Sequence, residues 1–142
     1  MTDADLREVR ISVVLAMRGG RLLMLERRDA NPMWDHKWEF PGGKIEDGEL
    51  PETAAKREFC EETGLDPMSL TFLGIHNHDW MMADGGILRV EIHCFRCEVR
   101  SSDVRIESRS AYSHAWATPE EALTYDCLAA NADLIRLFLL NH

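Results

Sequence analysis

The sequence lacks the features that would place this protein in a membrane or in an oxidising compartment. No apolar run approaches the roughly 20 residues that a membrane-spanning helix needs. The opening residues, MTDADLREVR, are acidic and polar, unlike a secretory signal. Only four cysteines are present, and their spacing suggests no disulfide framework. We therefore expect a cytoplasmic protein with no membrane partner.

Positive charge is also scarce. The chain has 16 Lys and Arg against 25 Asp and Glu, a formal net charge of -9. Sequence-independent binding of DNA or RNA depends on clustered basic side chains, so we expect no nucleic-acid polymer as a partner. A polyphosphate ligand would be repelled by the same acidic chain, and metal ions are the simplest way to bring two such anions together.

Repeats, low-complexity tracts and linkers are absent as well. The 142 residues suffice for a hydrophobic core that needs neither disulfides nor a structural metal. Hydrophobic residues make up 45% of the chain and charged residues 29%, which is ordinary for a soluble globular protein. We expect a single domain over residues 1–142.

Cys94 and Cys97 have the C-x2-C spacing that suggests a zinc site. However, they lie in a run that is typical of a β-strand, where residues three apart point to opposite faces. No second cysteine pair accompanies them. We therefore expect no zinc site at these cysteines.

Strand-like and helix-like segments are mixed along the chain. Gly19-Gly20 joins two apolar runs as a two-residue hairpin turn. Strands are predicted at 11–18, 21–28, near 39–40, and at 71–80, 87–99 and 111–117, with a charged connection at 100–110. The order β-β-β-α-β-β-β-α-α predicts an α/β fold whose sheet is covered by helices on two sides.

Three helices complete this order. Pro51 suits the first turn of the first helix, and Gly64 suits its end. Thr118 begins the second, with a capping box to Glu121. The last is predicted over 132–141, with an apolar face formed by Leu134, Ile135, Leu137, Phe138 and Leu139.

The first helix carries the strongest chemical signal. At about 100° per residue, Glu58, Glu61 and Glu62 fall within an arc of about 100°. Like charges at this spacing destabilise an isolated helix by roughly 0.2–0.5 kcal/mol per pair. A hard cation such as Mg²⁺ or Mn²⁺ reverses that sign, because carboxylate oxygens are its preferred ligands.

The surroundings of this helix fit a ligand that carries phosphates. A loop at 42–44 (GGK) lets the backbone approach a ligand that a Cβ would obstruct. Arg57 lies four residues before Glu61 and can orient a carboxylate through a charge-assisted hydrogen bond. The alternative is a solvated acidic helix face behind a glycine turn. A solvated helix face would not require Gly43, Glu49 and Arg57 to stand at fixed spacings in the sequence. Their spacing therefore favours a ligand site.

Residues 42–65, GGKIEDGELPETAAKREFCEETGL, fill every position of the pattern G-x5-E-x7-R-E-U-x-E-E-x-G-U, where U is apolar. The matching residues are Gly43, Glu49, Arg57, Glu58, Phe59, Glu61, Glu62, Gly64 and Leu65. This segment resembles the signature box of the Nudix hydrolase family. The resemblance implies an α/β/α sandwich with a mixed β-sheet. It also implies metal-dependent hydrolysis of a diphosphate linkage attached to a nucleoside or similar group.

The resemblance implies a role for each of these side chains. Mg²⁺, or Mn²⁺ in its place, would be bound by the carbonyl of Gly42 and by Glu58, Glu61 and Glu62. Arg57 and Glu49 would orient this cluster. Glu58 is a metal ligand, the base that accepts a proton from the attacking water, or both. A further glutamate ligand usually comes from the loop before the late strand, where Glu107 is the acidic candidate.

Residues outside the box resemble the MutT type of this family, which hydrolyses nucleoside triphosphates and removes oxidised guanine nucleotides. The segments LERR (25–28) and EFPGG (39–43) have that type's spacing, which implies that Arg28 meets the substrate together with Gly43 and Lys44. Asn131 resembles an asparagine that is presented to the base. Its amide offers a donor and an acceptor to the O6 and N7–H edge of 8-oxoguanine.

Several of these residues have a second interpretation. Asn131 also suits the N-cap of the last helix, and Arg28 a surface position at a strand end. Trp34 stacks on a base or packs into the core. His76 and His78 share a strand face and contact a ligand or solvent. The remaining tryptophans are assigned to packing: Trp38, Trp80 and Trp116.

Other substrates and functions remain compatible with the box. The same chemistry serves a nucleoside diphosphate sugar, ADP-ribose, a dinucleotide polyphosphate or a pterin triphosphate. A noncatalytic nucleotide-sensing domain is the alternative from a different class, although such domains usually carry a degenerate box. The sequence leaves monomer and homodimer open.

Overall fold

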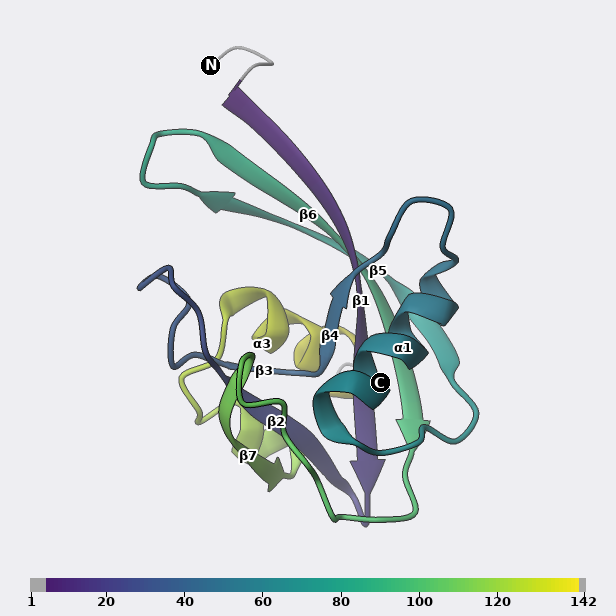
Figure 1. The fold of residues 1–142 in the computed structure, drawn as a ribbon. Helices are drawn as coiled ribbons and strands as arrows, with labels where there is room; N and C mark the ends of the chain where they lie inside the picture. The colour runs from purple at the N-terminus through teal and green to yellow at the C-terminus, as the bar shows by residue number, and fades with distance from the viewer. Residues whose placement is uncertain (1–4, 141–142) are drawn as a thin grey trace.

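A mixed sheet of seven strands organises the computed structural model, which describes residues 5–140 (Figure 1). The strands are β1 (Leu6–Arg18), β2 (Arg21–Arg27), β3 (Trp38–Glu39), β4 (Gly42–Lys44), β5 (Thr71–Met81), β6 (Ile87–Glu98) and β7 (Ala111–Ala117). The main order is β3-β2-β1-β6-β5, with β4 paired to β1 and β7 to β2. β1 and β6 are parallel and the other pairs antiparallel, so the predicted mixed sheet is confirmed.

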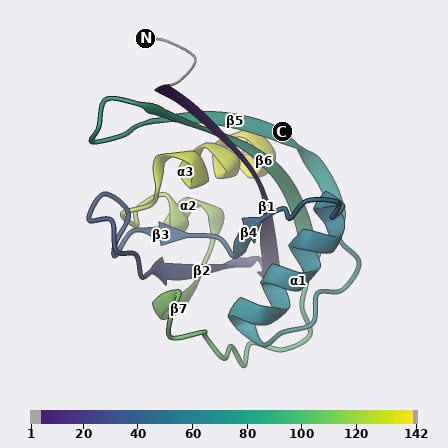
Figure 2. The same cartoon turned by 45° about the horizontal axis from the view of Figure 1, so that its top comes forward.

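Helices cover both faces of this sheet (Figure 2). They are α1 (Pro51–Thr63), α2 (Pro119–Ala122), α3 (Ala129–Ile135) and the π-helix η2 (Arg136–Leu140). In β1, Val14 and Ala16 pack in the cluster that contains Phe59 of α1. Val13 and Leu15 point the other way, into the cluster that α2 and α3 complete. The strand period of two thus feeds two cores, as an α/β/α sandwich requires.

The two cysteines of β6 follow the same alternation. Cys94 is buried in the core on the α3 side and Cys97 in the core on the α1 side. Both are free thiols. The prediction that the side chains of Cys94 and Cys97 point to opposite faces of a strand is confirmed.

Local sequence signals set the element ends as predicted. Gly19 and Gly20 have φ values of 59° and 77°, which allows the tight turn between β1 and β2. α1 begins without a side-chain cap at Leu50 and ends at Gly64, a left-handed residue with φ 69°. The capping box at Thr118 forms, although α2 is a single turn. Residues 100–107 form no helix or strand, as expected for a connection.

The glycine segment at 42–44 differs from the prediction. It is not a loop but the strand β4, with Gly43 opposite Ser12 of β1. A Cβ on Gly42 would lie 2.2 Å from the carbonyl oxygen of Ser12. Glycine therefore serves here for close strand packing, which propensity alone argues against.

The predicted last helix is also wrong in its extent. α3 begins three residues earlier than predicted, at Ala129, and the π-helix η2 follows from Arg136. Residue 141 lies outside the described residues. Leu134 and Ile135 of α3 are buried, whereas Leu137 in the π-helix is 44% exposed. No helix in residues 5–140 is both long and apolar enough to cross a membrane.

β1 and β2 stay together only next to their hairpin turn. Their pairing is confined to Met17 with Leu22 and Arg18 with Arg21. Beyond this point β1 pairs with β4 and β2 pairs with β7 and β3. Because of this divergence, β2 does not pair with the middle of β1. A cavity lined by residues of this part of β1 lies there.

Candidate functional site

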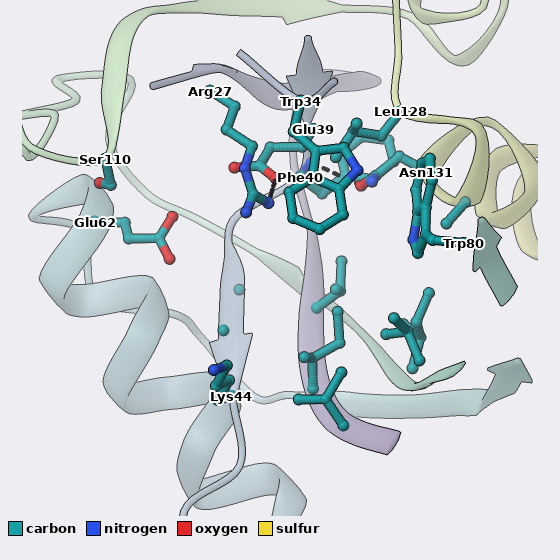
Figure 3. A pocket seen from close by; sticks show the side chains of 18 of the residues that line it. Arg27, Trp34, Glu39, Phe40, Lys44, Glu62, Trp80, Ser110, Leu128 and Asn131 are labelled. Carbon is teal, nitrogen blue, oxygen red and sulfur yellow. Dashed lines mark hydrogen bonds and ion pairs between the residues drawn. The ribbon is translucent and has the colours of Figure 1, made fainter. Parts of the chain in front are cut away.

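A cavity of about 460 Å³ lies along the divergence of β1 and β2 (Figure 3). Apolar side chains of β1 and β6, such as Ile11 and Val90, line its floor. Glu62 of α1 stands at one end, and Asn131 of α3 stands at the other. A cleft with an apolar body and a few polar groups at its ends is typical of a small-molecule site.

The carboxylate of Glu58 packs directly against β4. A Cβ on Gly43 would lie 2.3 Å from Glu58 Cδ and 2.6 Å from each of its carboxylate oxygens. Any larger residue would displace this carboxylate. The glycine at position 43 therefore makes room for Glu58, and the interpretation that it makes room only for a ligand is incomplete.

Arg57 organises the acidic residues around α1. Its Nε and Nη2 donate to the two carboxylate oxygens of Glu49 at 2.8 and 3.0 Å. Its Nη1 donates to Glu58 Oε1 at 2.9 Å, and Nη2 to the carbonyl of Lys44 at 3.2 Å. The predicted bond to Glu61 is replaced by a longer ion pair of 3.6 Å. The carboxylate of Glu58 is thus held by Arg57 and packed against Gly43.

Three carboxylates converge between α1 and the start of β4. Burial raises the pKa of Glu62 well above its ordinary value, and repulsion from Glu39 and then Glu58 raises it further. A hydrogen bond from the Gly42 backbone opposes this increase. Burial also raises the pKa of Glu58, against the lowering effect of Arg57. Carboxylates that lie close together and are shielded from water repel one another. A divalent cation bound between them would offset this repulsion.

Two other predicted ligands are placed less centrally. Glu61 is 52% exposed in its side chain, on the outer edge of α1. Glu107 lies in the connection before β7, where its backbone N–H donates to the carbonyl of Glu62 at 3.2 Å. The structure therefore brings Glu107 next to the end of α1, and its role as a ligand stays a prediction. The same holds for the carbonyl of Gly42, although Gly42 lines the cavity.

Glu39 is a member of this cluster that sequence reasoning missed. Its carboxylate accepts from Arg27 Nη1 at 3.0 Å. Burial raises the pKa of Glu39, and the Arg27 guanidinium opposes this. The sequence offered one signal, a glutamate immediately before the Phe-Pro-Gly-Gly segment, but not that it would face Glu62.

The two neighbouring arginines at the end of β2 both line the cavity. The predicted residue, Arg28, is exposed, and its guanidinium lies 4.0 Å from the ring centre of Tyr112. Arg27, which was not predicted, is held by Asp29 at 2.7 Å and lies 5.3 Å from the ring centre of Trp34. The pairing of β2 with β7 shifts register between Glu26 and Arg27, and the extra residue is Tyr112 of β7. The ring that Arg28 contacts therefore belongs to a bulge, which strand alternation alone does not predict.

Asn131 does not cap a helix. The N-cap of α3 is Leu128, and Asn131 is buried in the first turn. Its Oδ1 accepts the backbone N–H of Phe40 at 2.9 Å. This bond holds α3 against the segment before β4 and orients the amide, so that Nδ2 is its donor toward a ligand.

Two tryptophans form the wall beside Asn131. Trp34 and Trp80 both line the cavity, with ring centres 5.8 Å apart and planes at 77°. Trp34 Nε1 is buried and has no hydrogen-bond partner within residues 5–140. Trp34 therefore faces the site, and Trp80 combines its predicted packing with a place in the wall. The packing predicted for Trp38 and Trp116 is confirmed.

The remaining predicted residues lie at the margins. Lys44 is exposed at the rim, below Glu62 in Figure 3. His76 and His78 do not line this cavity. They line a separate hollow with Asp133 of α3.

Comparison with known proteins places the whole arrangement in one family. A model described as "NUDIX domain" matches residues 6–138. An Escherichia coli protein named CTP pyrophosphohydrolase is 30% identical over 131 residues, 91% of this chain and 91% of that protein. A "MutT-like protein" of Streptomyces ambofaciens is 32% identical over 120 residues, 84% of this chain and 70% of that protein.

A shorter match and a solved structure add to this. An 8-oxo-dGTP diphosphatase of Proteus vulgaris is 54% identical over 43 residues, 30% of this chain and 38% of that protein. The crystal structure of a MutT NUDIX hydrolase from Burkholderia pseudomallei superposes with a TM-score of 0.76 at 23% identity. It covers 92% of this chain and 97% of that one, which confirms the predicted fold.

The Glu49–Arg57 pair should make stability depend on pH. Hydrogen bonds from Arg57 and from the Glu46 backbone lower the pKa of Glu49 from 4.5 to about 2. A depressed pKa in the folded state stabilises the protein above the unfolded pKa, and the contribution is lost as pH falls through the folded pKa. We expect the Tm of the wild type to exceed that of Glu49→Gln at neutral pH, and this gap to close between about pH 4.5 and pH 2.

Circular dichroism melts across this pH range measure the gap. Glu52→Gln is the matched control, because Glu52 is an exposed glutamate in the first turn of the same helix. Its Tm should follow that of the wild type at every pH. A gap for Glu49→Gln that stays constant down to pH 2 would contradict the assigned ion pair.

Proposed function

The chain belongs to the NUDIX family of hydrolases, which act on diphosphate linkages, and we propose that it hydrolyses a nucleoside triphosphate to a monophosphate and diphosphate with Mg²⁺. One observation carries the proposal. One cavity has the carboxylates of Glu39 and Glu62 at one end and an aromatic wall with an oriented amide at the other. These ends match the two parts of a nucleotide, a charged phosphate chain and a flat base.

The phosphate chain belongs at the α1 end. Gly42 and Gly43 expose the backbone there, and Lys44 adds a positive charge at the rim. Bound Mg²⁺ would polarise a phosphoryl oxygen and neutralise the charge on the departing diphosphate. Arg27 stands between the two ends, with its guanidinium held by Asp29 and Glu39.

The glutamates of α1 have different roles. Glu58 and Glu62 would hold the metal, with Glu61 at the outer edge. Arg57 and Glu49 would orient Glu58. An attacking water forms a new bond to phosphorus, and the bridging P–O bond to the departing diphosphate breaks. The water proton passes to a carboxylate, which we assign to Glu58. Arg57 Nη1 donates to Glu58 Oε1 at 2.9 Å, which holds this carboxylate in a fixed position for that role.

The nucleobase of the substrate would lie beside Trp34, Trp80 and Asn131. An aromatic wall accepts any base, and hydrogen bonds must supply the selection. Asn131 offers its Nδ2 donor, since Oδ1 is bonded to Phe40, and the unpartnered Nε1 of Trp34 offers a second donor. Two donors favour a base edge with a carbonyl group. The O6 edge of 8-oxoguanine fits this requirement, and the second lone pair of Asn131 Oδ1 suits its N7–H.

A pyrimidine triphosphate is the second candidate. A relative that aligns over 91% of its own length is named CTP pyrophosphohydrolase. The O2 carbonyl of cytosine also accepts from an amide donor, so Asn131 does not separate the two bases by itself.

A nucleotide panel with Mg²⁺ tests the proposal, scored by products. We expect diphosphate release from 8-oxo-dGTP, at a kcat/KM at least roughly tenfold above that for dGTP, because ordinary guanine has no N7–H to donate. CTP, ADP-ribose and a dinucleotide polyphosphate complete the panel. Preference for CTP would overturn the choice of base and leave the triphosphate reaction standing. Turnover of only the diphosphate-bridged compounds, with monophosphates as products, would overturn the reaction itself.

Glu58→Gln should lower kcat for the best substrate by roughly 10²–10⁴-fold, because the amide can neither accept the proton nor bind the metal as a carboxylate does. The fold should persist, since the change removes a buried charge and keeps the volume. Stopped assays of diphosphate release and a melting curve measure the two effects. Glu52→Gln makes the same chemical change on the exposed side of α1 and should keep full activity. An active, folded Glu58→Gln enzyme would exclude Glu58 from the mechanism.

Asn131→Asp separates base recognition from structure. The aspartate keeps an oxygen for the Phe40 N–H but replaces the Nδ2 donor with an acceptor. We expect kcat/KM for the preferred nucleotide to fall roughly 10- to 100-fold, because a carbonyl of the base then meets no donor. Asn77→Asp, on an exposed position of β5, is the control and should change little. An unchanged ranking of bases in folded Asn131→Asp would remove Asn131 from recognition.

A further inference from the structure

A second group of metal-ligating side chains lies outside the cavity described above. It joins β5 to α3 and contains His76, His78 and Asp133, all half-buried. The hollow that these residues line, together with Asn77, Asp79 and Arg89, shares no residue with the nucleotide cavity. The strand period of two places both histidines on the face toward α3.

The donor atoms of this group already converge on one point. His76 Nε2 lies 3.1 Å and His78 Nδ1 3.8 Å from the same oxygen, Asp133 Oδ2. One donor atom from each of the three residues lies within 4.8 Å of the others. Ligands about 2.0–2.1 Å from a tetrahedral zinc ion are separated from one another by roughly 3.3 Å. An ion would therefore need only small side-chain movements to bind all three.

The charged neighbours permit a cation at this position. Arg89 is held by Asp79 through bonds of 2.9 and 3.0 Å, so that its charge is already balanced. Arg136 lies 4.0 Å from the other oxygen of Asp133, and its side chain is 62% exposed. It is therefore free to turn into solvent when an ion binds.

We propose that His76, His78 and Asp133 form a site for a late first-row transition-metal ion such as Zn²⁺, with a fourth position open to water. Two imidazoles and one carboxylate suit Zn²⁺, whereas Mg²⁺ prefers oxygen ligands in an octahedron. The ion would tie β5 to the helix that also carries Asn131, two residues before Asp133. This inference does not depend on the proposed reaction.

Zinc uptake by metal-free protein tests the site. Millimolar Mg²⁺ is included to occupy the glutamates of α1, and Zn²⁺ is added as the probe. We expect one Zn²⁺ per chain by metal analysis after desalting. We also expect a rise in Tm of about 5 °C or more when free Zn²⁺ is roughly 100-fold above Kd, because the ion binds only the folded state.

Asp133→Asn is the decisive variant, because an amide keeps the volume and a hydrogen bond to His76 but is a poor zinc ligand. We expect this variant and His78→Ala to lose both the bound Zn²⁺ and the rise in Tm. His114→Ala, which removes an exposed histidine of β7, should keep both. The Tm of each variant without Zn²⁺ verifies that it folds.

Two results would overturn the inference. One is the absence of Zn²⁺ uptake by the wild type under these conditions, which would leave Asp133 as a hydrogen-bond partner of His76. The other is uptake that persists in folded Asp133→Asn and His78→Ala but is lost in Glu58→Gln, which would place the ion at α1.

Discussion

The packing of the Glu58 carboxylate against Gly43 is the constraint on which the functional end of this protein depends. Gly43 has no side chain where the Glu58 carboxylate lies, so α1 packs closely against β4. Arg57 donates to both Glu58 and Glu49, so that one guanidinium balances two carboxylates. Glu62 is buried, and Glu39 and Glu58 are half-buried beside it. Like charges in such a place are costly unless a cation or protons offset them, and this cost would favour the metal ion that we propose.

The sheet topology converts this local arrangement into a cavity. β1 and β2 separate beyond their hairpin, and β4 takes the place beside β1 that β2 leaves. β4 is able to do so because Gly42 lets its backbone approach Ser12 closely. The middle of β1, with which β2 does not pair, forms the apolar floor of the cavity, and the carboxylates lie at one end of this floor. The carboxylate cluster and the cleft in which we propose that the nucleotide binds therefore arise from the same strand replacement.

The other end of the cavity depends on contacts between distant segments. Trp34 follows β2, Trp80 lies at the end of β5, and Asn131 belongs to α3. The bond from the Phe40 N–H to Asn131 joins this end to the residues just before β4. A movement of α3 would therefore change the positions of Asn131 and of the segment before β4 together. Asp133 of the His76–His78–Asp133 group belongs to the same helix, and an ion bound by this group would tie α3 to β5.

The sequence by itself determined the parts that depend on local geometry. The helical period placed Glu58, Glu61 and Glu62 on one face, the glycine pair at 19–20 gave the hairpin turn, and the strand period separated Cys94 from Cys97. Tertiary structure alone decided the use of Arg27 beside Arg28, the inclusion of Glu39, and the contact of Asn131 with Phe40. Arg27 is placed by its ion pairs with Asp29 and Glu39. Glu39 is placed by the pairing of β3 with β2, and Asn131 by its hydrogen bond from Phe40. Each results from packing between residues far apart in the chain, and local periodicity carries no information about such contacts.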